Sequence, residues 1–157
     1  MRSYDFIGEL PKSIRLYHIT RKSRLKSVLS SGLRARYSEE ARGNVLYLAS
    51  SPSNAVMWRE FEEESSTYGY PSDMVILSVL VPKGTLLYED PEAFGEGGSY
   101  YVTSNIPAKN IRAIRSISSG RIPDWVMTSK DRLGKQREAY IDKLAEAYSE
   151  VSSREVK

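Results

Sequence analysis

Hydrophobic and polar residues form short runs along this chain, and the pattern of each run predicts one element. Ile14 to Ile19 alternates β-branched and aromatic residues with polar ones, which predicts a strand. Val45 to Ala49 predicts a second strand in the same way. Met74 to Val81 is nearly all apolar, which is typical of a strand buried on both faces. Three shorter strands are expected later in the chain, at Leu86 to Tyr88, Tyr100 to Thr103 and Ile111 to Ile117.

Helical spacing of apolar residues predicts three helices. Residues 21–31 place leucine and valine on one face, and Gly32 is expected to end this helix because glycine adopts the left-handed conformation at little cost. Ser53 to Glu63 is expected to form the second helix, with Pro52 tolerated at its start. Asp131 to Val151 is expected to form the third, with its apolar residues roughly on one side.

The remaining stretches are mostly polar or rich in glycine and proline, and we expect residues 1–13 and 34–43 to be a loose lead-in and a loop. The strands gather late in the chain with no helices between them. This order argues against a doubly wound parallel sheet and favours a mixed α+β sandwich. We expect residues 1–120 to form one domain and residues 121–157 to form a mobile helical C-terminal extension that packs on the domain or on a partner.

The composition limits the chemistry that this chain can carry. Its 157 residues fit one domain, and 40% hydrophobic residues with 27% charged residues are ordinary for a globular protein. There is no cysteine, which excludes disulfides, zinc–thiolate sites and thiol nucleophiles. No apolar run is long enough to span a bilayer and no secretory signal is visible, so we expect a cytoplasmic protein with no membrane partner. The net charge of +3 permits a nucleic-acid partner without implying one.

The single histidine, His18, is the first candidate for chemistry, and being alone it excludes any site that needs two histidines. Taken by itself, a histidine in the middle of a strand is more often a half-buried structural residue. The glycines at 95–98 are not followed by a helix, so they do not match a dinucleotide fingerprint, and no serine elbow is present. The acids at 62–64 are typical of a solvated helix end, and no metal site is expected.

The setting of His18 changes this interpretation. The motif at 16–20 (Leu-Tyr-His-Ile-Thr), the short helix that follows it, and the stretch from Val45 to Pro52 resemble the ADP-ribosyltransferase superfamily. The opening strand is most similar to that of DarT-type DNA ADP-ribosyltransferases. The stretch from Tyr101 to Ile111 is similar to the closing strand of that family and equally to the end of the tRNA 2′-phosphotransferases, which share the fold. The resemblance covers roughly residues 14–117.

The resemblance implies a fold, an activity and a substrate. The fold would be a largely antiparallel, split β-sheet sandwich of ADP-ribosyltransferase type, with flanking helices and a C-terminal helix. The activity would be that of an NAD-dependent ADP-ribosyltransferase, a glycosyltransferase that takes NAD as substrate and modifies a macromolecule. The acceptor would be a nucleic acid, such as DNA, or a protein. A toxin-like enzyme of this kind could have an antidote protein, or form a homo-oligomer through the C-terminal helix.

The resemblance also assigns cofactor-binding residues. His18 would donate a hydrogen bond to the adenosine-side ribose of NAD, and the backbone of Ile19 would hold the nicotinamide amide, with Tyr17 part of the same motif. Tyr47 would stack on the nicotinamide ring, at about 0.5–1.5 kcal/mol beyond the burial of area. Cations of the following loop would pair with the diphosphate, although an exposed basic loop is an equal interpretation of any one of them. The candidates are Arg34, Arg36 and Arg42.

One position departs from the family pattern. The family's catalytic glutamate opens the closing strand, where it stabilises the cationic sugar of the transition state, and this chain has Ser99 there. Glu96 lies three residues earlier and is the leading substitute, with Glu92 and Asp90 as further candidates.

Without such an acid, two readings stay open. The domain is then either a catalytically inactive nucleotide- or protein-binding module, or it performs a glutamate-independent reaction of the phosphotransferase type. Those enzymes rely on several arginines and a second histidine, and this chain has one histidine. An unrelated α+β domain that contacts nucleic acid through its basic tail is the third hypothesis.

Overall fold

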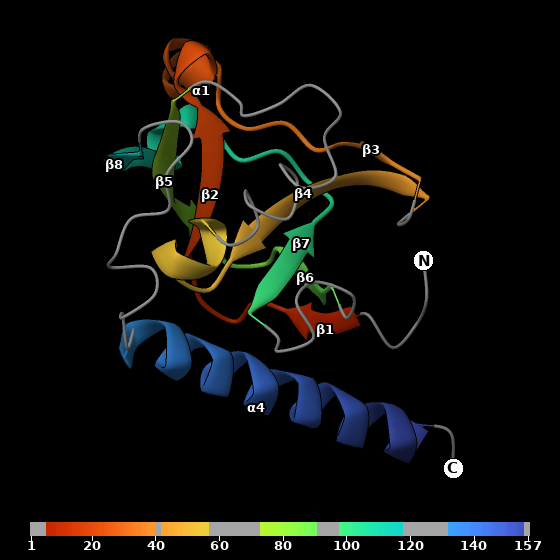
Figure 1. Cartoon of the computed structure of the whole chain (residues 1–157). Helices are drawn as coiled ribbons and strands as arrows, with labels where there is room; N and C mark the ends of the chain where they lie inside the picture. The colour runs from red at the N-terminus through yellow and green to blue at the C-terminus, as the bar shows by residue number, and fades with distance from the viewer. Residues whose placement is uncertain (1–5, 40–41, 57–72, 91–97, 118–131, 156–157) are drawn as a thin grey trace.

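The computed structural model describes residues 6–39, 42–56, 73–90, 98–117 and 132–155 of the chain (Figure 1). Within these ranges the protein is α+β, as predicted, with a mostly antiparallel eight-stranded sheet. The strands are β1 (Phe6–Glu9), β2 (Ile14–Arg21), β3 (Arg36–Ser38), β4 (Gly43–Ala49), β5 (Met74–Val81), β6 (Leu86–Glu89), β7 (Ser99–Val102) and β8 (Ile111–Ile117). The helices are α1 (Leu25–Ser31) and α4 (Arg132–Glu155), with short 3-10 helices at Lys22–Arg24 and Ala108–Asn110 and a helical segment at 52–56. No helix in the described ranges is both long enough and apolar enough to cross a membrane.

The sheet has two well-paired halves that share a narrow junction. The strand order is β1-β6-β7-β4-β2-β5-β8, with β3 added to β4. β2 pairs with β5 over its whole length, from Ile14↔Val81 to Arg21↔Met74. By contrast, the pairing of β2 with β4 in the described residues consists of Tyr17↔Ala49. Beyond this pair, the later part of β2 and the earlier part of β4 are not joined by a ladder, and the sheet is split there.

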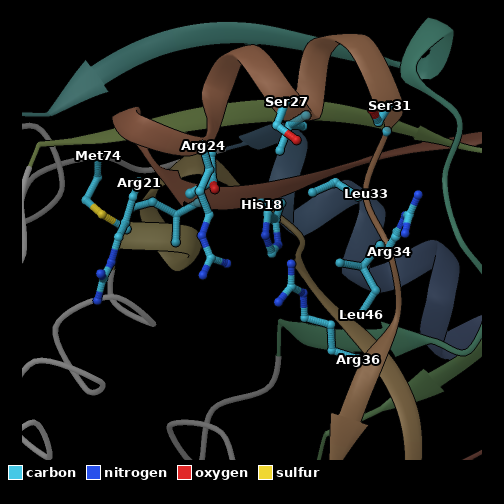
Figure 2. A pocket seen from close by; sticks show the side chains of 14 residues that line it. His18, Arg21, Arg24, Ser27, Ser31, Leu33, Arg34, Arg36, Leu46 and Met74 are labelled. Atoms are coloured by element: carbon cyan, nitrogen blue, oxygen red, sulfur yellow. The ribbon is translucent and has the colours of Figure 1, made fainter.

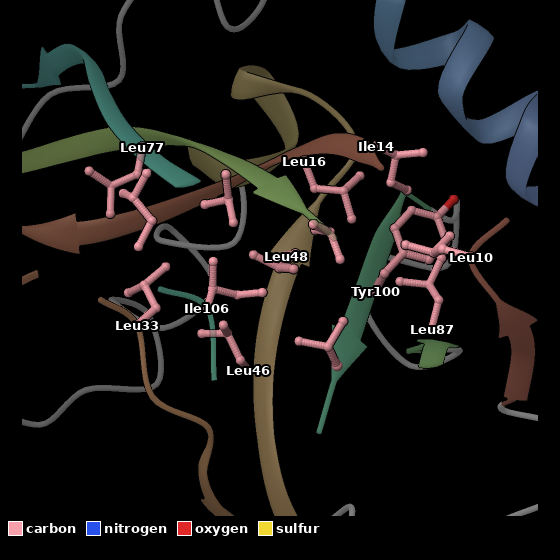
Figure 3. Packing of buried hydrophobic residues seen from close by; sticks show 14 of the residues in the cluster. Leu10, Ile14, Leu16, Leu33, Leu46, Leu48, Leu77, Leu87, Tyr100 and Ile106 are labelled. Atoms are coloured by element: carbon pink, nitrogen blue, oxygen red, sulfur yellow. The ribbon is translucent and has the colours of Figure 1, made fainter. Parts of the chain in front are cut away.

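Alternation along the strands divides the buried residues into two clusters. In the first cluster, Leu16, Leu48 and Leu77 pack together with Tyr100 between the two halves of the sheet (Figure 3). The second cluster contains Tyr17 and the neighbouring strand positions, and the helical segment 52–56 covers it with two small side chains. Its members are Tyr17, Ala49, Ala55, Val56, Met74, Ile76 and Ile117. Adjacent residues of β2 therefore face different environments.

The long apolar runs were predicted well and the short edge strands were not. β5 and β8 have the predicted bounds, and β2 extends the predicted strand to Arg21. Two stretches expected to be irregular are strands instead. β1 pairs with β6 although its register shifts at Gly8, and β3 pairs with β4 from Arg36↔Val45 to Ser38↔Gly43. β1 (Phe-Ile-Gly-Glu) and β3 (Arg-Tyr-Ser) lack the run of three apolar or aromatic residues by which the equally short β6 and β7 were predicted, so they depend on their partners for definition.

Gly32 ends α1 as predicted. Its φ of 87° is a left-handed conformation that favours glycine, and a Cβ at this position would collide with the carbonyl oxygen of Ile106. This close approach lets Leu33 and Ile106 exchange backbone hydrogen bonds of 2.9 and 2.8 Å. The C-terminal end of α1 is therefore fixed to the turn before β8.

The expected C-terminal helix is present, and it packs on the domain. Ile141 of α4 is fully buried in the first cluster, where Leu144 and Tyr140 pack beside it. The Ser50 hydroxyl donates to the Glu138 carboxylate at 2.7 Å, and Arg137 Nη1 donates to the carbonyl of Ser50 at 3.1 Å. Figure 1 shows α4 lying across the end of the sheet near β1. The expected boundary at residue 120 and the second half of the predicted helix 53–63 lie outside the described residues.

We predict that Ile141→Ala lowers the free energy of unfolding by about 2–5 kcal/mol, because it removes buried methyl groups and leaves a cavity under α4. Lys143→Ala is the matched control, since Lys143 is exposed on the same helix and alanine keeps the helix propensity. Urea denaturation of both variants measures the difference. An Ile141→Ala cost no larger than that of the control would contradict the docking of α4.

Candidate functional site

His18 lies one residue beyond the junction of the two half-sheets and bridges the split. Its Nδ1 is 2.8 Å from the carbonyl oxygen of Tyr47 on β4. A carbonyl oxygen only accepts hydrogen bonds, so the protonated nitrogen of the ring is Nδ1, which donates. In the neutral imidazole the other nitrogen, Nε2, is therefore an acceptor. One hydrogen bond thus sets both the orientation and the tautomer of the ring.

The same ring is kept neutral at physiological pH. Burial lowers the pKa of His18 below its usual 6.5, and the hydrogen bond to Tyr47 opposes this only in part. Part of the residue is still accessible to solvent, but the pKa follows the desolvation of the ring. His18 is therefore a neutral hydrogen-bond acceptor in the folded protein at pH 7.

His18 lines a pocket of about 760 Å³, which opens between the end of β2, α1 and the start of β3. Part of its wall is apolar and belongs to the first buried cluster, through Val28, Leu33 and Leu46. Its polar lining is dominated by arginines. The polar side chains in the lining, apart from His18 and Thr20, are Arg21, Arg24, Arg34, Arg36, Ser27 and Ser31. We call these four arginines with His18 the arginine pocket.

The four guanidinium groups come from different elements and gather around one imidazole. Figure 2 shows Arg24 and Arg36 extending toward His18 from opposite sides, with Arg21 and Arg34 farther out on either flank. Arg21 ends β2 and Arg24 ends the following 3-10 helix, whereas Arg34 and Arg36 lie after α1. All four are exposed to solvent, so their charged groups are accessible to a ligand.

The electrostatics of the arginine pocket are one-sided. No carboxylate is among its described lining residues, and within the described part of the chain no hydrogen bond or ion pair engages any of the four guanidinium groups. Arginine stays protonated at any physiological pH, so four positive charges face the same space without compensation. Such an arrangement attracts anions, and the planar guanidinium fork matches carboxylate and phosphate oxygens in pairs. In the described residues, no group of three His, Asp or Glu could hold a metal ion.

Two lysines in the same stretch behave differently from the arginines. Lys22 and Lys26 are exposed and take no part in the lining of the pocket. The stretch from Leu10 to Ser38 contains no aspartate or glutamate at all. Sequence reasoning missed Arg21 and Arg24 as site residues, and this acid-free stretch is the signal that could have found them.

The residues expected to bind a cofactor are only partly brought together. Ile19 and His18 are in the lining of the pocket, as are two of the three cations expected to meet a diphosphate, Arg34 and Arg36. The third, Arg42, is exposed on the turn before β4, with a φ of 54°, and does not line the pocket.

Tyr17 is buried away from the pocket. It belongs to the second cluster, and its ring lies under the guanidinium of Arg137 from α4 at 5.1 Å. Strand alternation is the reason, because it gives neighbouring residues opposite faces. Tyr17 therefore supports the packing of α4 rather than a ligand.

The His18 and Tyr47 rings were both expected to hold NAD, but the register of the strands puts them on opposite faces of the sheet. Tyr17 and Ala49 are paired and both belong to the second cluster, so alternation puts Tyr47 on their face of the sheet and His18 on the other. The Tyr47 hydroxyl is 3.2 Å from the hydroxyl of Ser38 on β3, and its ring meets the ring of Tyr101 edge-on at 5.9 Å. Tyr47 contributes its backbone carbonyl to the site, and its ring is engaged elsewhere.

Ser99, the position of the family's glutamate, is not in the lining of the arginine pocket. Ser99 begins β7, pairs with Ala49 and is buried, and its hydroxyl has no hydrogen-bond partner. The backbone N–H of Asp90 donates to the carbonyl of Ser99 at 3.0 Å, which places Asp90 next to the position of the family's glutamate. Glu96 and Glu92 lie outside the described residues.

A comparison of the sequence with protein-family models and with curated proteins finds no match.

We predict that the pKa of His18 is below 6.5 in the folded protein. His18 is the single histidine, so an NMR titration of its ring protons reports on it without assignment. The sign follows for stability: below pH 6.5 the unfolded chain takes up a proton that the folded state resists, so the free energy of unfolding falls as the pH falls, by at most about 1.4 kcal/mol per pH unit. His18→Asn, which keeps a donor toward Tyr47 but does not titrate, should lose this dependence. A measured pKa at or above 6.5 would exclude the buried neutral ring.

Proposed function

We propose that this chain binds a nucleotide by its phosphate groups in the arginine pocket, and that the nucleotide is NAD. The observation that carries the proposal is the set of four uncompensated arginines around a neutral histidine. A volume of about 760 Å³ is suited to a ligand of nucleotide size. Nucleotides combine the two features that this lining can recognise, which are phosphate oxygens and ribose hydroxyls.

The division of labour follows from the donor and acceptor types. Arginine forks donate pairs of hydrogen bonds to phosphate oxygens. His18 Nε2 accepts, so it is suited to a ribose hydroxyl, which can donate. This reverses the direction expected from the resemblance, in which His18 was the donor, because the single ring proton is already committed to the Tyr47 carbonyl. Ser27 and Ser31 add hydroxyls at the wall formed by α1.

The choice of NAD draws on the split between β2 and β4. The resemblance to ADP-ribosyltransferases implies a split sheet, and in this protein the two strands share one pair and then separate beside His18. The arginine pocket lies at this separation. The split beside the candidate site supports the choice of NAD, while the nicotinamide-stacking role of Tyr47 is not supported.

The second candidate function is ADP-ribosyl transfer from the bound NAD to a macromolecule, nucleic acid or protein. This reaction needs a carboxylate beside the nicotinamide ribose to stabilise the cationic sugar. The observation in its favour is the hydrogen bond that places Asp90 next to Ser99 at the start of the closing strand. Without an acid in reach, the domain is a nucleotide-binding module that does not turn NAD over.

We predict that NAD raises the melting temperature and that Arg24→Ala or Arg36→Ala weakens its binding roughly 10- to 100-fold, because each removes charge-assisted hydrogen bonds to phosphate. The matched controls are Lys22→Ala and Lys26→Ala, which remove the same charge from the same stretch outside the lining. Thermal shift and calorimetric titration of each variant give the comparison. If the lysine variants weaken binding as much as the arginine variants, general surface charge explains the affinity and the site assignment fails.

For the second candidate, release of nicotinamide from NAD is expected to be abolished by Asp90→Asn and to survive Glu96→Gln, because Asp90 is the acid that lies beside Ser99. The reverse result would place the catalytic acid on Glu96, the leading substitute from the resemblance. Asp90→Asn should still bind NAD, since Asp90 is not among the described residues that line the arginine pocket, and NAD binding is measured for both variants. Chromatography of the reaction over time measures turnover. If the wild-type protein binds NAD and releases no nicotinamide with any acceptor, the transferase candidate is excluded and the binding module stands.

A further inference from the structure

We infer that the nucleotide held in the arginine pocket carries a third phosphate group, in addition to a diphosphate. This inference rests on the proposed function and names the ligand class of the same site. It starts from a count of charges. Four arginines line the pocket and none of its described lining residues carries a carboxylate, whereas the bridging diphosphate of a dinucleotide carries two negative charges.

The placement of the arginines supports the same conclusion. Arg24 and Arg36 approach His18 (Figure 2). They are therefore suited to a diphosphate whose ribose donates a hydrogen bond to His18. Arg21 and Arg34 lie on the two flanks, beyond this central pair. Two adjacent phosphates span only a few ångströms, and a bidentate contact needs oxygens directly opposite the fork. The flanking arginines are therefore suited to a further anionic group.

The cations of this stretch also differ in type between those that line the pocket and those that do not. Within residues 21–36, every arginine lines the pocket and both lysines stay outside it. Arginine and lysine give the same net attraction to anions at a distance, but arginine adds directional pairs of hydrogen bonds. Arginine at all four lining positions is thus the pattern expected for contacts to phosphate oxygens, including those of Arg21 and Arg34.

The shared chemistry is a nucleotide with a phosphate beyond the diphosphate, and two sources provide it. One is a dinucleotide phosphorylated on the adenosine ribose, such as NADP. The other is a nucleoside triphosphate, such as ATP. The two place the third phosphate on opposite ends of the ribose-diphosphate unit, so they should depend on different flanking arginines.

The experiment compares dissociation constants for two pairs, NAD with NADP and ADP with ATP, by calorimetry at constant ionic strength and without divalent metal. In at least one of the two pairs, we expect the third phosphate to lower the dissociation constant about tenfold or more. Arg21→Ala or Arg34→Ala should reduce that ratio toward one, and Lys22→Ala should leave the ratio unchanged. Circular dichroism and the melting temperature of each unliganded variant establish that it is folded.

Several results would overturn the inference. Equal affinities within both pairs would show that the flanking arginines read no third phosphate, while NAD binding itself would leave the nucleotide proposal standing. If the third phosphate still tightens binding in Arg21→Ala, in Arg34→Ala and in the double variant, the effect is non-specific attraction. If the affinity for NAD rises only when a single-stranded oligonucleotide is added, the flanking arginines serve a second ligand rather than a third phosphate. Failure of all four nucleotides to bind would remove the proposed function as well.

Discussion

The hydrogen bond from His18 Nδ1 to the Tyr47 carbonyl is the interaction on which the candidate site depends. It crosses from β2 to β4 just where the ladder between these strands has ended. The imidazole donates to this carbonyl from the neighbouring strand, beyond the last pair of the ladder. The same bond leaves Nε2 as the acceptor of a residue that lines the arginine pocket. One side chain therefore links the two half-sheets and sets the hydrogen-bonding character of part of the pocket.

The hydrophobic core and the arginine pocket share three residues. Val28, Leu33 and Leu46 belong to the first buried cluster and also form the apolar wall beside the arginines. Burial of these side chains holds α1 and β4 in place, and Gly32 permits the close approach that completes the wall. Without this packing, the backbone from which the long arginine side chains extend would not be held in place. The arginines therefore extend from backbone next to residues of the core, while their side chains are exposed to solvent.

Sequence patterns were sufficient for the parts of this fold that depend on local periodicity. The apolar run of β5 and the glycine at the end of α1 are of this kind. β1 and β3 could not be found in this way, because their sequences lack an apolar run and the strands are defined by pairing with β6 and β4. In the site, His18, Arg34 and Arg36 were expected from the family resemblance. Which face Tyr17 and Tyr47 occupy depends on register across the split, and no periodicity within one strand contains that information.

The arginine pocket takes nearly all of its polar lining from one uninterrupted segment, from the end of β2 through α1 to β3. β4 adds Leu46 to the lining and a carbonyl that orients the imidazole. The positive charge of the pocket is thus encoded in a single short block of sequence, and the strands of the sheet hold this block in place. A few neighbouring codons can therefore change the charge of the pocket without disturbing the long-range strand pairing that defines the fold.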